Sequence, residues 1–194
     1  FSFELNMPKI IEVNITKKIK CSRDVAFWNS WDHEHLDVVH SGYSKSSILY
    51  DKKNFLFRID DIQLPLFSFV KIQTPIFQVQ HDDETLITYA VQFGVLSRTI
   101  ITIKEIDKTT SEINSNYQFF LNGWKRIFEP FLKMMIPIWN AKVWKEDLTI
   151  KLRRQKVVDM NFVDFVGLPK NVNDRIKNKD YKLSLPIPRP KNSP

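Results

Sequence analysis

The chain has 194 residues, of which 43% are hydrophobic and 26% charged, and its formal net charge is +7. This length and balance predict one globular domain with a substantial core. With four glycines, fifteen phenylalanines and neither G-x-G-x-x-G nor G-x4-G-K-[ST], the sequence gives no support to nucleotide binding through those motifs. No apolar run approaches the roughly 20 residues that a membrane-spanning helix needs.

The first predicted elements are a strand and a helix. Residues 10–19 alternate between apolar and polar side chains, with Ile11, Val13 and Ile15 on one side, which is typical of a half-buried strand. Ser22 then provides a helix N-cap, and the helix that follows ends near residues 41–42. The single cysteine, Cys21, excludes an internal disulfide and fits a reducing compartment, so we expect a cytoplasmic protein.

A histidine-rich motif lies on this predicted helix, with the pattern N-x2-D-x2-H-x4-H. At about 100° per residue, its polar members share one arc with apolar residues. The arc comprises Trp28, Asn29, Asp32, His35, Leu36, Val39 and His40. Neutral imidazole is the commonest protein ligand of metals. The motif therefore indicates a metal site, with a helix end that happens to be rich in histidine as the alternative.

Residues 44–121 predict an antiparallel meander. Segments rich in Ile, Val, Phe, Tyr and Thr alternate with polar turns at residues 51–54, 81–84 and 107–110. Strands joined by such short connections pair with their neighbours in the chain.

A long helical pattern runs from Gly123 to about Val158, with Pro137 as an expected kink. Beyond this proline, Glu146 falls on a polar face with Lys142, whereas Asp147 falls among apolar side chains. We therefore expect Glu146 to be solvated and paired with Lys142 at i, i+4. A buried carboxylate needs a partner or a metal, so Asp147 is either a metal ligand or bonded to an inward-facing strand residue.

The motif from Asn29 to His40, followed by Glu146-Asp147 on the late helix, resembles the catalytic domain of Rieske non-haem iron oxygenases. The order of strand, helix, antiparallel sheet and long helix is similar to the helix-grip fold of START domains and the birch pollen allergen. The resemblance implies an α+β fold in which the sheet wraps around the long C-terminal helix and leaves a cavity between them.

The resemblance also implies the site. His35, His40 and Asp147 would ligate one Fe(II) as a two-His, one-carboxylate set that leaves positions open for dioxygen and substrate. Asp32 would support a ligand histidine between the iron and the electron donor, and with Asn29 it forms the expected catalytic pair. Family members are trimers, which implies a homo-oligomer.

One departure from that family is serious. A Rieske [2Fe–2S] cluster needs two cysteines and two histidines, and this chain has one cysteine. Four alternatives stay open. The sequence, which begins at Phe1, is a catalytic fragment; the cluster lies on another protein; the iron needs no delivered electrons; or the metal is lost and only a ligand cavity remains.

The expected function is a mononuclear non-haem Fe(II) oxygenase-type domain that acts on a hydrophobic, aromatic or polycyclic small molecule. Its partners would be dioxygen and an external electron donor, either an iron–sulfur protein or a missing Rieske domain. The alternative is a START-like carrier that binds a hydrophobic small molecule without a metal.

The chain divides into a helix-grip domain at residues 1–167 and a basic, proline-rich tail at residues 168–194. From Lys170 to Pro194 there are seven basic residues and two acidic ones, so most of the net charge lies in this tail. The tail lacks the interleaved aromatic residues of a single-strand binding surface. We therefore expect no nucleic-acid partner.

Overall fold

The structure is a computed structural model, and it describes residues 8–31, 35, 39–40, 42, 44–52, 55–64, 67–82 and 84–160. Asp32 and the tail at residues 168–194 lie outside the described residues. The expectations for this aspartate and for the tail, and the division into two regions, therefore stay predictions.

Seven antiparallel strands form one sheet in the order β1-β7-β6-β5-β4-β3-β2. The strands are β1 (Lys9–Ile19), β2 (Ser44–Lys52), β3 (Phe55–Leu64), β4 (Phe67–Gln80), β5 (Thr85–Gln92), β6 (Val95–Asp107) and β7 (Thr110–Leu121). From β2 to β7 each strand pairs with the next in the chain, which confirms the predicted meander. The first strand joins the far edge, where Val13 lies opposite Tyr117.

The alternation of β1 is also confirmed. Ile11 and Ile19 are buried, Val13 and Ile15 are partly buried, and the alternate residues Glu12, Asn14 and Thr16 are exposed. One face of β1 therefore packs against the interior and the other meets solvent, as a period of two residues requires.

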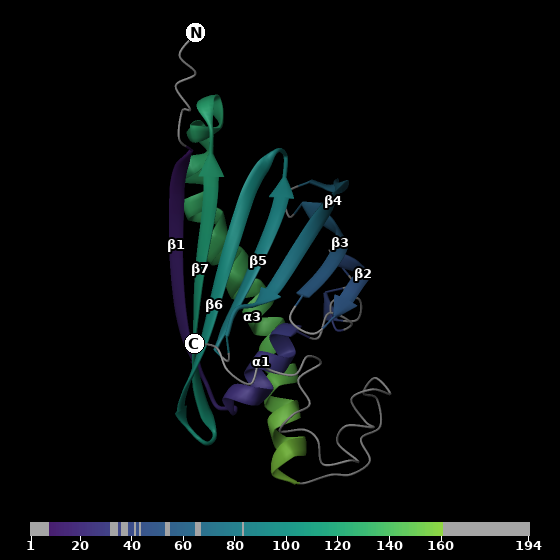
Figure 1. Cartoon of the computed structure of the whole chain (residues 1–194), viewed down its shortest axis with the longest axis vertical. Helices are drawn as coiled ribbons and strands as arrows, with labels where there is room; N and C mark the ends of the chain where they lie inside the picture. Colours follow the sequence, from purple (N-terminus) through teal and green to yellow (C-terminus); the bar gives the residue numbers. More distant parts are fainter. Residues whose placement is uncertain are drawn as a thin grey trace.

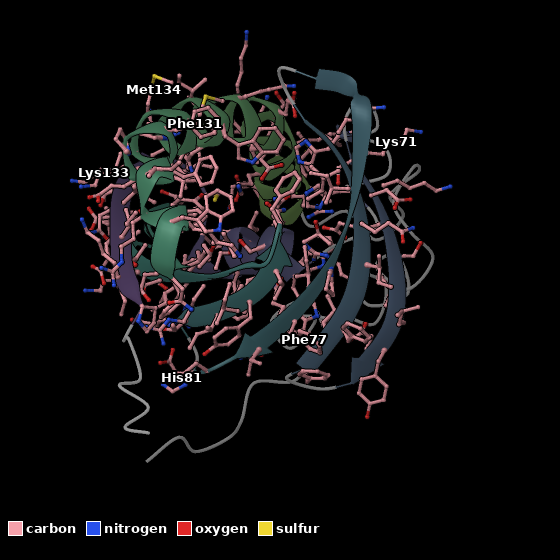
Figure 2. The ribbon with its side chains drawn as sticks, turned by 90° about the horizontal axis from the view of Figure 1, so that it is seen from above. Lys71, Phe77, His81, Phe131, Lys133 and Met134 are labelled. Carbon is pink, nitrogen blue, oxygen red and sulfur yellow. The ribbon has the colours of Figure 1, made fainter. Side chains whose placement is uncertain are left out.

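Within the residues that the structure describes, the helical elements with full bounds are α1 (Arg23–Trp31), the 3-10 segment η1 (Gly123–Phe128) and α3 (Glu129–Asp159). Figures 1 and 2 show α3 lying against one face of the curved sheet, with α1 next to its C-terminal half. This is the α+β, helix-grip arrangement that was expected. Among the described residues, no helix has the length and apolar character to span a bilayer.

The start of α1 follows from its cap. Ser22 Oγ accepts a hydrogen bond from the Val25 N–H at 3.4 Å, and Asp24 lies in the first turn. Both features satisfy or complement the unpaired N–H groups of a helix N-terminus. Phe27 and Trp31 then bury their rings in the main core, against Leu56, Leu86 and Ile103 of the sheet.

The core lies at one end of α3. Trp144, Leu148 and Leu152 of its C-terminal half pack against the core cluster. In the N-terminal half, Phe131, Met134 and Ile138 are exposed instead. The helix continues through Pro137, and it begins at Glu129 after the 3-10 segment, later than the Gly123 that the sequence predicted.

Candidate metal centre

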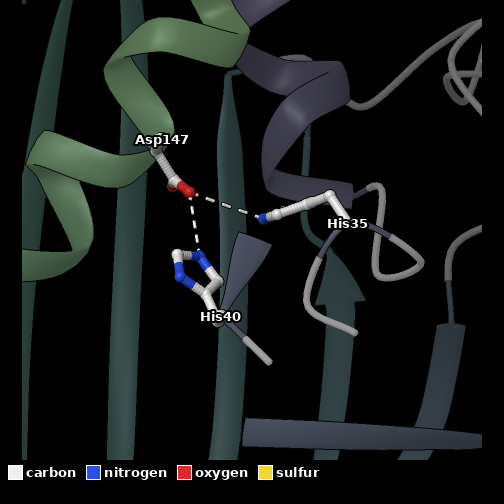
Figure 3. Close-up of side chains that lie close together, drawn as sticks. All are labelled: His35, His40 and Asp147. Carbon is white, nitrogen blue, oxygen red and sulfur yellow. Dashed lines mark hydrogen bonds and ion pairs between the residues drawn. The ribbon is translucent and has the colours of Figure 1, made fainter. Parts of the chain in front are cut away.

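The structure brings together the three residues expected as metal ligands. One ligand atom from each of His35, His40 and Asp147 lies within 4.8 Å of the others. Asp147 Oδ1 is 3.0 Å from His40 Nε2 and 3.5 Å from His35 Nε2. Figure 3 shows both imidazoles directed at this carboxylate, which comes from α3 while the histidines follow α1. Residues more than a hundred positions apart in the chain thus form one compact donor set.

The second ring nitrogen of His40 also has a carboxylate partner. His40 Nδ1 lies 2.6 Å from Glu146 Oε2. The expectation that Glu146 is only a solvated surface acid is therefore wrong, because the fold carries the His40 ring to α3 and places it between two adjacent acids. The predicted pairing of Glu146 with Lys142 stays a prediction. A carboxylate bonded to the far nitrogen of a ligand histidine fixes the orientation of its ring and makes it more basic.

Lys151 is part of the same cluster. Its ammonium Nζ donates to Asp147 Oδ2 at 3.2 Å, one helical turn further along α3, and the residue is only 5% exposed. Since Lys151 occupies Oδ2, the other oxygen, Oδ1, is the one that faces both histidines. The ammonium also lies 5.0 Å from the centre of the Trp144 ring.

These contacts shift the protonation of the cluster. Burial alone would lower the pKa of His40, but hydrogen bonds to Asp147 and Glu146 and their negative charges raise it above its usual value. Burial alone would raise the pKa of Asp147, but hydrogen bonds from His35 and His40 and the charge of Lys151 lower it far below its usual value. In the absence of a metal ion, a protonated His40 between two carboxylates satisfies the charges of these groups.

Two polar atoms beside the cluster are buried without a partner. They are Asn29 Nδ2 and His35 Nδ1, which have no hydrogen bond among the residues that the structure describes. The other amide atom of Asn29, Oδ1, accepts a hydrogen bond from Arg154 Nη1 at 3.1 Å. Asn29, one of the two expected catalytic residues, is thus held beside the site, and its N–H donors remain available to a ligand or water. The other, Asp32, lies outside the described residues.

A cavity of about 310 Å³ adjoins the cluster, between α3 and the sheet. On the helix side, α3 contributes the apolar side chains of Trp139, Val143 and Trp144, next to the polar ones of Asn140, Asp147 and Lys151. On the sheet side many walls are polar; they include Arg58, Asp60, Gln78, Thr88, Thr99, Ser115 and Tyr117. The cavity therefore has aromatic and aliphatic walls from α3, as expected. The strands contribute aliphatic walls from Ile62, Ile101 and Ile113, together with many hydrogen-bonding groups.

The strongest polar feature of the sheet side is a buried ion pair. Arg58 Nε donates to Asp60 Oδ1 at 2.9 Å and to Oδ2 at 3.1 Å, and Ser46 Oγ donates to Oδ1 at 2.8 Å. Both charged residues are less than 10% exposed. Burial of two charges is tolerated because they are paired and hydrogen-bonded.

Cys21 is no nucleophile in this structure. Its side chain is fully buried, and this burial raises the pKa of the thiol to about 11, against a smaller opposing effect of Lys151. A thiol with so high a pKa is not in the reactive thiolate form.

Sequence reasoning missed Glu146, Lys151, Arg58 and Asp60. Two of them carried a signal. Lys151 lies four residues after Asp147 and so on the same helical face. Arg58 follows Leu56 by two residues and so points to the same side of β3. Nothing comparable pointed to Glu146, because its contact depends on where His40 comes to lie.

Comparisons with known proteins place the fold. No family model matches the sequence, and no curated protein matches it. Among solved structures, norcoclaurine synthase from Thalictrum flavum, in complex with dopamine and hydroxybenzaldehyde, is 14% identical with a TM-score of 0.60; the match covers 76% of this chain and 89% of that one. An aromatase/cyclase from Streptomyces is 9% identical with a TM-score of 0.58, over 77% and 95% of the two chains.

A third similar structure is dicamba monooxygenase bound to 3,6-dichlorosalicylic acid. It is 12% identical with a TM-score of 0.57, and the match covers 89% of this chain and 58% of that one. At such identities the likeness is one of fold alone. The chain therefore has the α+β helix-grip fold that these proteins share.

Proposed function

We propose that this domain is a mononuclear non-haem Fe(II) enzyme of the oxygenase type, which binds a small organic molecule in the cavity between α3 and the sheet. The observation that carries this proposal is the donor set of His35, His40 and Asp147, with ligand atoms within 4.8 Å of one another beside a cavity of about 310 Å³. Two histidines and one carboxylate with open positions are characteristic of non-haem Fe(II) oxygenases.

Glu146 and Lys151 orient two of the three proposed ligands. Glu146 holds His40 through Nδ1, so Nε2 is the nitrogen that faces the other ligand atoms. Lys151 holds one oxygen of Asp147 and leaves the other directed at the histidines. When bound, the iron would supply activation of dioxygen next to the substrate. The residues of this chain would orient the ligands and exclude bulk water from the cavity, and Glu146 would hold the remaining proton of His40 on Nδ1, so that Nε2 is the nitrogen that gives up its proton to the metal.

The lining of the cavity favours an aromatic or polycyclic small molecule as the substrate. Trp139 and Trp144 offer flat apolar walls on α3, and Asn29 Nδ2 offers an unpartnered donor. Two of the similar structures hold small aromatic molecules, namely dopamine with hydroxybenzaldehyde and 3,6-dichlorosalicylic acid. Electrons would come from an external donor, either a separate iron–sulfur protein or a Rieske domain outside this sequence, because one cysteine cannot hold the cluster.

A second candidate is a carrier that binds a hydrophobic small molecule without a metal. One observation favours it: His40 bridges Asp147 and Glu146, and Lys151 pairs with Asp147, so the cluster satisfies most of its own charges without a cation. The aromatase/cyclase and norcoclaurine synthase share the fold, and they support a role in small-molecule binding or processing more directly than they support an iron oxygenase.

Metal content separates the two candidates. Protein purified without oxygen and reconstituted with Fe(II) should hold about one iron per chain by elemental analysis, and His35→Ala should lose it. Glu105→Ala, which changes an exposed acid on β6, is the matched control. If the wild-type protein holds no iron beyond that of the His35→Ala variant but still binds aromatic molecules, the carrier is the function.

A further inference from the structure

One end of the molecule exposes large apolar side chains in an unusual concentration. We call it the aromatic tip and define it as Phe93 and Gly94 of the β5–β6 turn, η1, and Phe131 and Met134 of α3. Within it, Phe93, Trp124 and Ile127 are 66%, 68% and 71% exposed. Figure 2 looks down on this end and shows Phe131 and Met134 on α3. Single exposed apolar residues are ordinary, but contiguous ones mark an interaction surface.

The parts of the aromatic tip are held together as one surface. Lys125 Nζ of η1 donates to the carbonyl oxygen of Gly94 at 2.7 Å, which joins the two loops. The rings of Trp124 and Phe128 meet edge to face with centroids 5.6 Å apart. The tip is therefore built from two segments in contact, and its apolar side chains are neighbours in space.

The turn at the tip places an aromatic residue where backbone geometry disfavours it. Phe93 has φ of 51° and Gly94 has φ of 68°, as in a two-residue hairpin turn that favours Asn-Gly. A bulky residue at positive φ is rare, and such strain is retained mainly at functional sites. Since the Phe93 side chain is mostly exposed, packing inside the domain does not explain its presence.

The charges around the tip are mostly positive. Lys9, Lys125, Arg126 and Lys133 lie in or next to it, while Glu129 is the one carboxylate within residues 119–134. This carboxylate is itself paired with Lys133 at 2.8 Å and with Lys9. The surface thus combines an apolar centre with basic residues around it.

We propose that the aromatic tip docks on the surface of an anionic lipid bilayer. Trp and Phe side chains favour the interface between headgroups and acyl chains. Basic side chains beside them are attracted to anionic headgroups. A symmetric contact between two copies would instead bring the same cations face to face, which makes a second copy of this chain a poorer occupant.

Docking would also bring a second cavity next to the bilayer. This cavity, of about 390 Å³, is lined largely by apolar residues, among them Phe93, Trp124, Phe128 and Phe131 of the tip. An apolar molecule dissolved in the membrane could enter it without crossing water. The proposal stands on the tip alone and does not depend on a metal at His35, His40 and Asp147.

The test is sedimentation of the whole protein with vesicles. Vesicles of phosphatidylcholine with about one third phosphatidylglycerol should carry the protein down at low salt, and vesicles of phosphatidylcholine alone should carry down far less. Raising NaCl from about 0.05 M to about 0.5 M should weaken binding several-fold, because salt screens the attraction between the basic residues around the tip and the anionic headgroups. The double variant Trp124→Ser/Ile127→Ser should lower vesicle binding at least tenfold.

The matched control is Ile106→Ser on β6. Ile106 is also apolar and 50% exposed, but it lies at the other end of its strand. It should bind vesicles as the wild type does. Circular dichroism and thermal unfolding of all variants establish that the fold is unchanged.

Three results would overturn the proposal. The first is no sedimentation with either kind of vesicle. The second is equal loss of binding in the Ile106→Ser control and the tip variant. The third is a concentration-dependent dimer in light scattering that Trp124→Ser/Ile127→Ser abolishes, because the tip would then be an interface between copies of this chain.

Discussion

The two halves of α3 present opposite kinds of surface. Around Asp147, just past the middle of the helix, charged groups are buried and paired with one another. Around Phe131, at the N-terminal end, apolar side chains are exposed and cations surround them. At about 1.5 Å per residue, these two residues lie about 24 Å apart along the helix. One helix therefore carries two surfaces too distant to share contacts.

The buried charge cluster and the exposed apolar surface should respond differently to substitution. A buried charge cluster depends on specific atoms at specific distances, so one substitution should change it strongly. An exposed apolar surface depends on summed area, so one substitution should change it weakly and leave the fold intact.

Asp147→Ala should have the largest effect. It removes the carboxylate that both histidines and Lys151 contact. We expect loss of measurable Fe(II) or Co(II) binding, and a stability loss of about 3–5 kcal/mol, because Lys151 is left buried without this partner. Calorimetric titration with metal and chemical unfolding measure the two effects. Full metal affinity in this variant would show that Asp147 is no ligand.

Glu146→Ala should weaken metal binding without abolishing it. Glu146 bonds the His40 nitrogen that faces away from the other ligands, and loss of such a partner typically costs about 10–100-fold in metal affinity. Glu146→Gln keeps an acceptor oxygen and should recover part of the loss. Co(II) titration followed by absorbance compares the variants. If alanine and glutamine behave like the wild type, Glu146 is only a surface acid.

Lys151→Met should strengthen metal binding, on the order of tenfold, because a buried ammonium next to Asp147 repels a divalent cation. Methionine retains most of the apolar stem and so preserves packing against Trp144. The same Co(II) titration measures the change. A weaker affinity would mean that Lys151 serves chiefly to orient the carboxylate.

The metal-free and metal-loaded forms should respond oppositely to pH. The pKa of His40 is raised above 6.5 in the folded state, so its contribution is fully present below about pH 6.5 and is lost as pH rises through the folded value. The pKa of Asp147 is lowered from 3.8, so its contribution is present above about pH 4 and is lost as pH falls towards the folded value.

Metal binding instead requires His40 to lose the proton at Nε2, so affinity should increase with pH. Thermal unfolding from pH 5 to pH 9, with and without Co(II), measures both trends. His40→Gln should flatten the metal-free profile in this range. A metal-free stability that rises with pH through this range would contradict the role given to His40.

Changes at the aromatic tip should leave the metal site untouched. Trp124→Ser/Ile127→Ser replaces two side chains that are about 70% exposed, so stability should change by no more than about 0.5 kcal/mol per site. Metal affinity should be unchanged, because sites this far apart act independently. A shift in both quantities would mean that the two ends of α3 are coupled.

The fold class, the strands and the three residues whose ligand atoms lie together could all be predicted from the amino-acid sequence. Alternation in residues 10–19 and short polar turns from residue 44 onward are local properties, so they predicted β1 and the meander. The family resemblance of the histidine motif and Asp147 predicted His35, His40 and Asp147 as one set of ligands. One ligand atom of each lies within 4.8 Å of the others.

Only the tertiary structure decided what surrounds those residues. Helical periodicity gives the face of α3 on which Glu146 lies, but it cannot say that His40 packs between this acid and its neighbour. Strand alternation places Arg58 on the same side of β3 as Leu56, but it cannot show that Arg58 and Asp60 pair with each other at the wall of a cavity. A side chain's chemistry is fixed by its sequence position, whereas its partners depend on contacts between elements far apart in the chain. Those contacts exist only once the sheet has closed around α3.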